Sequence, residues 1–114
     1  MKAHHNLLVW QRSIRFVTDI YKLTETFPKN ELYGLINQMR RAAVSIAANI
    51  AEGAARNSKR EFNRFLSMAQ GSVAELETHL IISENLGYCS DIRSLLNELD
   101  EISKMIVGLM KSLD

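Results

Sequence analysis

Apolar positions between Val9 and Phe27 recur at the spacing of an α-helix. Two series step through this segment by four, three and four residues. At about 100° per residue they lie roughly 110° apart on the helix surface and form a wide apolar arc. The two series are Trp10, Ile14, Val17 and Tyr21, and Phe16, Ile20, Leu23 and Phe27. We therefore expect one helix that packs against two different surfaces.

A second helix is predicted after Pro28, with Asn30 as its N-cap and Glu31 in its first turn. Its core stripe is expected to comprise Leu32, Leu35, Met39, Ala43, Ile46 and Ile50. The opposite side carries small or weakly polar residues, where a solvated face would carry more Lys and Glu. We therefore expect a subunit interface there. The candidate interface residues are Asn37, Arg41, Val44, Ser45 and Ala48.

Gly53 is expected to end the second helix, and Ser58 with Glu61 matches the capping box that begins a third helix near Lys59. Gly87 is the predicted stop of this helix. Its core series is Phe62, Phe65 or Leu66, Ala69, Val73, Leu76, Leu80 and Ser83. Gly71 interrupts the series at a cost of about 1 kcal/mol relative to alanine. Either a close backbone approach near the level of Arg40 or local flexibility would explain this glycine.

The last helix is predicted to begin at a Ser90 cap and to have the cleanest amphipathic pattern in the chain. Its apolar positions are Ile92, Leu95, Leu99, Ile102, Ile106, Leu109 and Leu113. The connections between the four helices are short, so sequential helices become antiparallel neighbours. The sequence thus predicts an all-α fold, an antiparallel up-down-up-down four-helix bundle formed by residues 1–114 as one domain.

Composition agrees with one soluble domain. The chain has 114 residues, of which 46% are hydrophobic, and a chain of this length buries roughly two thirds of its unfolded surface. Cys89 is its single cysteine, which excludes an intramolecular disulfide and favours a reducing compartment. We find no secretory leader pattern and no apolar run long enough to span a bilayer. A cytoplasmic protein without membrane contact is expected.

Metal ligands and nucleophiles are scattered in the sequence. His4 and His5 are adjacent near the N-terminus without acidic or cysteine neighbours, and Cys89 lacks an evident activating base. We assign no metal, no cofactor and no catalytic residue, and expect a protein that is not an enzyme.

Glu75 and Glu77 do not form a carboxylate pair, because residues at i and i+2 point in different directions on a helix. We expect Glu75 to form an ion pair with Arg40 or Arg41 across the second and third helices. His79 lies four residues after Glu75, which allows a surface hydrogen bond between them. Asn49, near the end of the second helix, is expected to form a structural hydrogen bond.

The bundle topology separates the charges of the chain, although its net charge is only +1. One end collects residues 1–15, 47–64 and 104–114, with nine basic and three acidic residues, including Asp114, for a net charge of +6. The remaining residues sum to −5. Clustered cations can neutralise nucleic-acid phosphates. Candidate contacts are Arg12, Arg15, Arg56, Lys59, Arg60 and Arg64. A solvated end, or one that forms salt bridges between subunits, is the alternative.

Several stretches resemble one protein family over nearly the whole chain. They are "VWQ", "YGLINQMRRAAVSIAANIAEG", "SKREFNRFLSMAQGSVAELETHL" and "LGY". They resemble the four-helix-bundle proteins encoded within 23S rRNA intervening sequences and by many stand-alone bacterial genes. The resemblance implies a homopentamer, related to the accessory protein of diversity-generating retroelements, which works with a reverse transcriptase and nucleic acid. Ala47 stands where the family commonly has proline, so a straighter helix is expected here.

These observations lead to one functional hypothesis and one alternative. We expect a noncatalytic homo-oligomeric adaptor whose basic end binds RNA or DNA without sequence specificity, or a nucleic-acid-bound protein such as a reverse transcriptase. The alternative is a structural or protein-interaction module with no nucleic-acid role.

Overall fold

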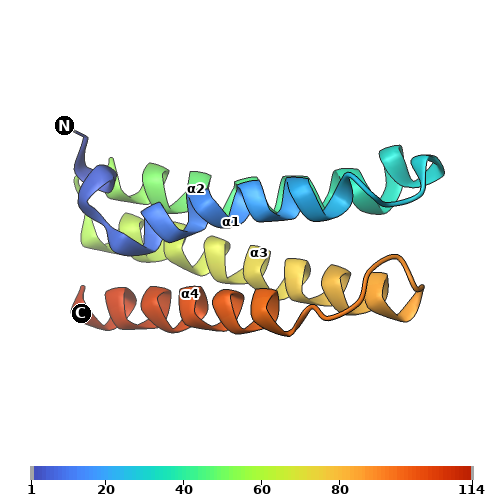
Figure 1. Cartoon of the computed structure of the whole chain (residues 1–114). Coiled ribbons are helices and arrows are strands. Elements are labelled where there is room, and N and C mark those ends of the chain that lie inside the picture. The colour runs from blue at the N-terminus through green and yellow to red at the C-terminus, as the bar shows by residue number, and fades with distance from the viewer. Residues whose placement is uncertain (1, 114) are drawn as a thin grey trace.

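The computed structural model describes residues 2–113, and within this range the chain forms four α-helices preceded or joined by short helical turns. The helices are α1 (Leu8–Thr24), α2 (Asn37–Ala54), α3 (Lys59–Asn85) and α4 (Arg93–Ser112). The short turns are η1 (Ala3–Asn6), η2 (Lys29–Glu31) and η3 (Leu32–Ile36). Both termini lie at the same end as the α2–α3 turn, and consecutive helices run antiparallel (Figure 1). The predicted up-down-up-down bundle is confirmed.

The wide apolar arc of α1 divides into a covered side and an open side. Phe16, Ile20 and Phe27 are buried in the core with residues of the other three helices. In the series of Trp10, Ile14, Val17 and Tyr21, Trp10 and Val17 pack partly buried against the core, whereas Ile14 and Tyr21 remain 43% and 41% exposed. The chain therefore covers one of the two predicted surfaces fully and the other only in part.

Gly53 lies inside α2, so the expectation that it ends the helix is wrong. The helix continues to Ala54, and Gly53 is buried against the start of α3. A Cβ atom at this position would lie 2.8 Å from Cβ of Phe65 and 2.9 Å from Cδ1 of Phe62. The glycine is required because the backbone of α2 passes directly over the Phe62 ring and the Cβ atom of Phe65.

The predicted limits of α3 are confirmed. The backbone N–H of Glu61 donates to Oγ of Ser58 at 3.2 Å, which is half of the capping box. The Glu61 side chain binds Arg64 instead of returning to the cap. At the other end Gly87 has φ 77°, and the N–H of Tyr88 donates to the carbonyl of Ser83 at 3.0 Å, as in a Schellman motif.

The start of α2 differs from the prediction. Asn30 is not a cap; the Glu31 carboxylate accepts the N–H of Leu35 across the π-helical turn η3. This wider turn rotates the following residues, so Leu32 is exposed and Ile36 is buried in its place. The rest of the predicted stripe lies in the core, with Leu35 half-buried. The helix runs without interruption through Ala47, as expected from the absence of proline there.

The start of α4 also differs. Ser90 does not cap this helix, which begins after Ile92 without a side-chain cap. Asp91 adopts a left-handed conformation, with φ 52°, that turns the chain between Ser90 and the helix. The predicted core series of α4 is confirmed: Leu99, Ile102 and Ile106 are fully buried, and its outer members pack against them.

Gly71 is exposed on α3, and no described side chain or neighbouring backbone lies within 4 Å of its Cβ position. The explanation by close approach near Arg40 is therefore wrong. Local flexibility at this glycine stays a prediction.

Alanine substitutions at the two helical glycines are expected to have opposite effects. Gly53→Ala overpacks the contact with Phe62 and Phe65, and should lower the free energy of unfolding by about 1–2 kcal/mol even after alanine's better helix propensity. Gly71→Ala places a methyl group in open space and should raise the free energy of unfolding by about 0.5–1 kcal/mol. Urea unfolding followed by circular dichroism measures both. Equal effects of the two substitutions would contradict the close contact at Gly53.

Candidate nucleic-acid interface

Of the six predicted cations, Arg56, Lys59, Arg60 and Arg64 come from the α2–α3 turn and the start of α3, at the end of the bundle that holds this turn (Figure 1). The expectation that Arg12 and Arg15 lie at the same end is wrong, because they stand in the middle of α1, beside the first half of α4. Arg12 and Arg15 lie on α1 and border a hollow between α1 and α4. Arg60 and Arg64 lie on the first turns of α3, beside a hollow of about 710 Å³ that reaches α4. The cations therefore form two groups on the two sides of α4. Asp114, counted in the predicted charge of this end, lies outside the described residues.

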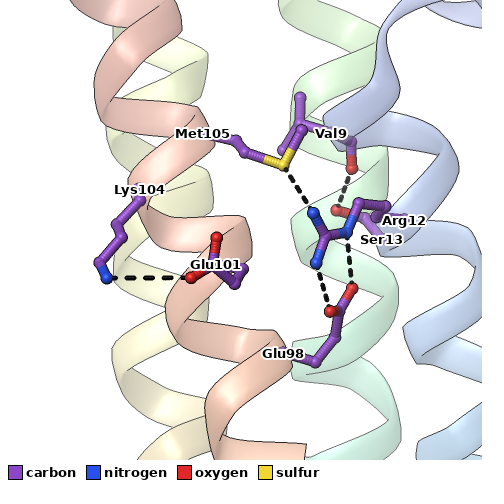
Figure 2. A network of polar contacts seen from close by, with 7 residues as sticks. All are labelled: Val9, Arg12, Ser13, Glu98, Glu101, Lys104 and Met105. Atoms are coloured by element: carbon purple, nitrogen blue, oxygen red, sulfur yellow. Dashed lines mark hydrogen bonds and ion pairs between the residues drawn. The ribbon is translucent and has the colours of Figure 1, made fainter.

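Arg12 binds α4. Its Nε donates to Oε2 of Glu98 at 2.9 Å, its Nη2 donates to the other carboxylate oxygen, and its Nη1 lies 3.5 Å from Sδ of Met105 (Figure 2). The side chains of Arg12 and Glu98 are 24% and 32% exposed, respectively. The hydrogen bond to Glu98 raises the pKa of Arg12 above its ordinary value. Within residues 2–113 this is the only ion pair that joins two helices, so Arg12 holds the bundle together with its charge already neutralised.

Arg56 and Arg64 form local ion pairs on the surface. Arg64 donates to both carboxylate oxygens of Glu61 at 3.0 and 3.1 Å, and these hydrogen bonds lower the pKa of Glu61. Arg56 lies 3.5 Å from the carboxylate of Glu52. The two guanidinium carbons lie 5.0 and 4.6 Å from the centroid of the Phe65 ring. The ring of a core residue thus positions two arginines beside each other.

The remaining three cations are Arg15, Lys59 and Arg60. All three are exposed, and none has an ion pair or a side-chain hydrogen bond to any residue from 2 to 113. Lys59 and Arg60 stand at the start of α3, with Arg56 and Arg64 before and after them. These three of the six predicted cations are therefore available to an external anion, and Lys59 and Arg60 are the two among them that lie at the end with the α2–α3 turn.

The predicted subunit interface lies on the outer side of α2. Asn37, Arg41, Val44 and Ser45 border a hollow of about 400 Å³ between α1 and α2. Asn37, Arg41 and Ser45 also border a second hollow of about 480 Å³, between α2 and α3. Ala48 is exposed on the same side of the helix. The predicted residues are thus brought together, on a surface that has an apolar and a polar part.

Asn49 has the structural role that was predicted for it. Its Nδ2 donates to the carbonyl oxygen of Ser45 at 2.8 Å and to Oγ of Ser45 at 3.0 Å. Oγ of Ser72 donates to the same hydroxyl at 2.9 Å, which joins α3 to this network. A second polar link, between Gln70 and Ser103, ties α3 to α4.

The ion pair predicted between Glu75 and Arg40 or Arg41 is wrong. Glu75 contacts His79 instead, at 3.2 Å between Oε2 and Nε2. Arg40 is turned toward α1, where its Nε donates to Oγ1 of Thr24 at 2.9 Å and its guanidinium lies over the Tyr21 ring. The helical register places Arg40 over the α1–α2 seam, away from α3.

Sequence reasoning missed two aromatic features. The rings of His4 and His5 pack on Trp10, with centroids 4.8 and 5.3 Å from it, and fix η1 against α1. Tyr33, in η3 just before α2, is 91% exposed. The only sequence signal for Tyr33 was an aromatic residue beside a glycine, Gly34, at a helix start.

Within the described part of the chain, no group of three or more His, Cys, Asp and Glu side chains could hold a metal ion. Cys89 is half-buried, and this burial raises the pKa of its thiol. No helix among residues 2–113 has the length and apolar character needed to cross a membrane.

The fold and the charged end define a four-helix-bundle protein with clustered cations at the end that holds both termini. A family model described as "23S rRNA-intervening sequence protein" matches residues 5–108. The chain belongs to this family, as its sequence motifs predicted. A search of curated proteins found no match to the chain.

The Arg12–Glu98 pair is expected to stabilise the bundle more than a typical surface ion pair, because it is bidentate and partly buried. In a double-mutant cycle with Arg12→Gln and Glu98→Gln, we expect a coupling energy of about 1 kcal/mol that decreases in high salt. Thermal unfolding of the four proteins measures it. The exposed pair Arg64–Glu61 is the matched control; a coupling at Arg12–Glu98 no larger than in this control would contradict the assignment.

Proposed function

We propose that this protein is a noncatalytic homo-oligomeric adaptor that binds the phosphates of RNA or DNA through its basic end, without sequence specificity. The observation that carries the proposal is the pair of free cations Lys59 and Arg60 at the start of α3. Arg56 and Arg64 stand on either side of them, positioned by the Phe65 ring. Four cations thus follow one another along a turn that is anchored in the core.

The local ion pairs at this end do not oppose phosphate binding. Glu52 and Glu61 pair with Arg56 and Arg64 at exposed positions, where ion pairs contribute little and exchange readily. A phosphate that approaches these arginines releases counterions from the nucleic acid, which favours association at low salt. Contacts of this kind position a nucleic acid without reading its bases, which supports sequence-independent binding.

Exposed apolar side chains support assembly into an oligomer. Tyr21 and Val44 border the hollow between α1 and α2, and Ile14 continues the same side of α1. These apolar residues are uncovered in one chain, and a second copy would bury them. The family resemblance supports five copies. A ring of equivalent subunits repeats the basic end on one face, so weak contacts add up.

A structural or protein-interaction module is the second candidate. Arg12 supports it, because this predicted nucleic-acid contact is used for an ion pair within the bundle. The apolar α1–α2 surface would serve this function without any nucleic acid. In either case we propose the cytoplasm as the compartment, because a lone cysteine fits a reducing environment.

Removing the two free cations should weaken nucleic-acid binding. We expect Lys59→Gln with Arg60→Gln to lower affinity for a mixed-sequence duplex several-fold at low salt, and to make the dependence of log affinity on log salt less steep. Fluorescence anisotropy across a salt series measures both quantities.

The matched control removes the same charge from the opposite end, with Lys29→Gln and Arg93→Gln, both exposed positions. This variant should bind as the parent does. If the parent protein shows no salt-sensitive binding above that of a neutral protein, nucleic-acid contact is refuted and the second candidate is favoured.

Adding charge to the apolar α1–α2 surface should dissociate the oligomer. Val44→Glu, at a residue that is 44% exposed, is expected to lower the mass in solution toward that of one chain. Val107→Glu is the matched control, because it adds the same charge on α4 at a residue that is 39% exposed, and it should leave the mass unchanged. Light scattering at micromolar concentration gives the masses. A monomeric parent, or an equal effect of both substitutions, would contradict this surface assignment.

A further inference from the structure

The turn before α2 presents an aromatic ring to solvent in a defined way. Residues Leu32–Ile36 form a π-helical turn, and Gly34 within it has φ −110° and ψ −112°, outside the helical region. Tyr33 is 91% exposed, more than any other large apolar or aromatic side chain in the described range. Short π-helical segments occur frequently at functional sites. The ring therefore requires an explanation other than packing within the chain.

Glu31 fixes this turn. Its carboxylate accepts the N–H of Leu35 at 3.4 Å and the hydroxyl of Tyr88 at 2.8 Å, and Tyr88 belongs to the α3–α4 connection. A Cβ atom at Gly34 would lie 2.8 Å from Oε1 of Glu31, so a larger residue here would displace this carboxylate from its observed position. The turn that carries Tyr33 is thus tied to the other connection at the same end of the bundle (Figure 1).

Beside Tyr33 lies a polar hollow of about 480 Å³ between α2 and α3. Arg41, Asn37 and Gln38 border it, and within residues 2–113 their side chains form no ion pair or hydrogen bond with another residue. By contrast the neighbouring Arg40 is fully engaged with α1. The hollow therefore combines an exposed ring, a free guanidinium and two free amides. Asn37 and Arg41 also border the α1–α2 hollow proposed for assembly, but Tyr21 and Val44, apolar residues of that hollow, do not border this one.

We propose that this hollow binds one nucleotide of a single-stranded nucleic acid. The Tyr33 ring stacks on the base, because every base offers a π-face to an aromatic side chain. The Arg41 guanidinium binds the adjacent phosphate, and Asn37 and Gln38 donate to and accept from the base edge or the sugar. Glu75 also lines the hollow, but its carboxylate contacts His79, with 3.2 Å between Oε2 of Glu75 and Nε2 of His79.

This site is independent of the basic end. It lies in the half of the bundle that holds η2, η3 and the α3–α4 connection, opposite the termini (Figure 1). The two sites also differ in the ligand they recognise. Phosphate contacts at the basic end accept single strands and duplexes, whereas stacking on Tyr33 requires an unpaired base. The structure thus assigns single-strand preference to the hollow.

The test uses the full chain and a labelled single-stranded adenosine oligonucleotide, with a duplex of the same length for comparison. We expect Tyr33→Ala to weaken single-strand affinity about tenfold, the effect of losing one stacked base. Tyr33→Phe should retain the affinity, because the ring is preserved. Arg41→Gln should weaken binding, whereas Arg93→Gln, an exposed arginine on α4, should not. Duplex binding should be unchanged by Tyr33→Ala.

Three results would overturn the proposal. They are a parent protein that does not bind the single strand, a Tyr33→Ala variant that binds it as well as the parent does, and equal losses for single strand and duplex. In the second case, a change of mass of the Tyr33→Ala variant in light scattering would assign the hollow to a contact between subunits. The Lys59→Gln and Arg60→Gln variant separates the two sites, since it should retain the Tyr33-dependent preference for single strands even if duplex binding is lost.

Discussion

The contact of Gly53 with the Phe62 ring and with Cβ of Phe65 determines how closely α2 and α3 approach at the basic end. These two helices share the most extensive interface in the bundle, and the turn between them follows from this contact. Phe65 lies under Arg56 and Arg64, so the same core residue that meets α2 also positions the cations. The charge arrangement at this end therefore depends on a packing constraint inside the bundle.

The opposite seam, between α1 and α4, is held differently. A bidentate ion pair between Arg12 and Glu98 joins the two helices there, next to the thioether of Met105 (Figure 2). One of the predicted nucleic-acid contacts is thus used to join two helices of the bundle. The outward series of α1 stays partly exposed, and it supplies the apolar surface on which the proposed assembly depends.

The two ends of the molecule consequently present different chemistry. The end with the termini displays free cations on a turn anchored by core rings, and the other end displays Tyr33 on a turn fixed by Glu31 and Gly34. In both cases exposed side chains are oriented by buried or hydrogen-bonded neighbours. An adaptor that holds nucleic acid at two places along its length would use both ends.

The sequence by itself determined the helices, their order and most of the core, because helical periodicity and short connections are local properties. It also placed the α3 cap at Ser58 and the α3 stop at Gly87 correctly. Only the tertiary structure decided that Gly53 makes a helix contact, that Arg12 belongs to Glu98, and that Glu75 turns to His79. Those outcomes depend on helix rotation and on which side chains face each other across a seam, and the spacing of residues along one chain does not specify either.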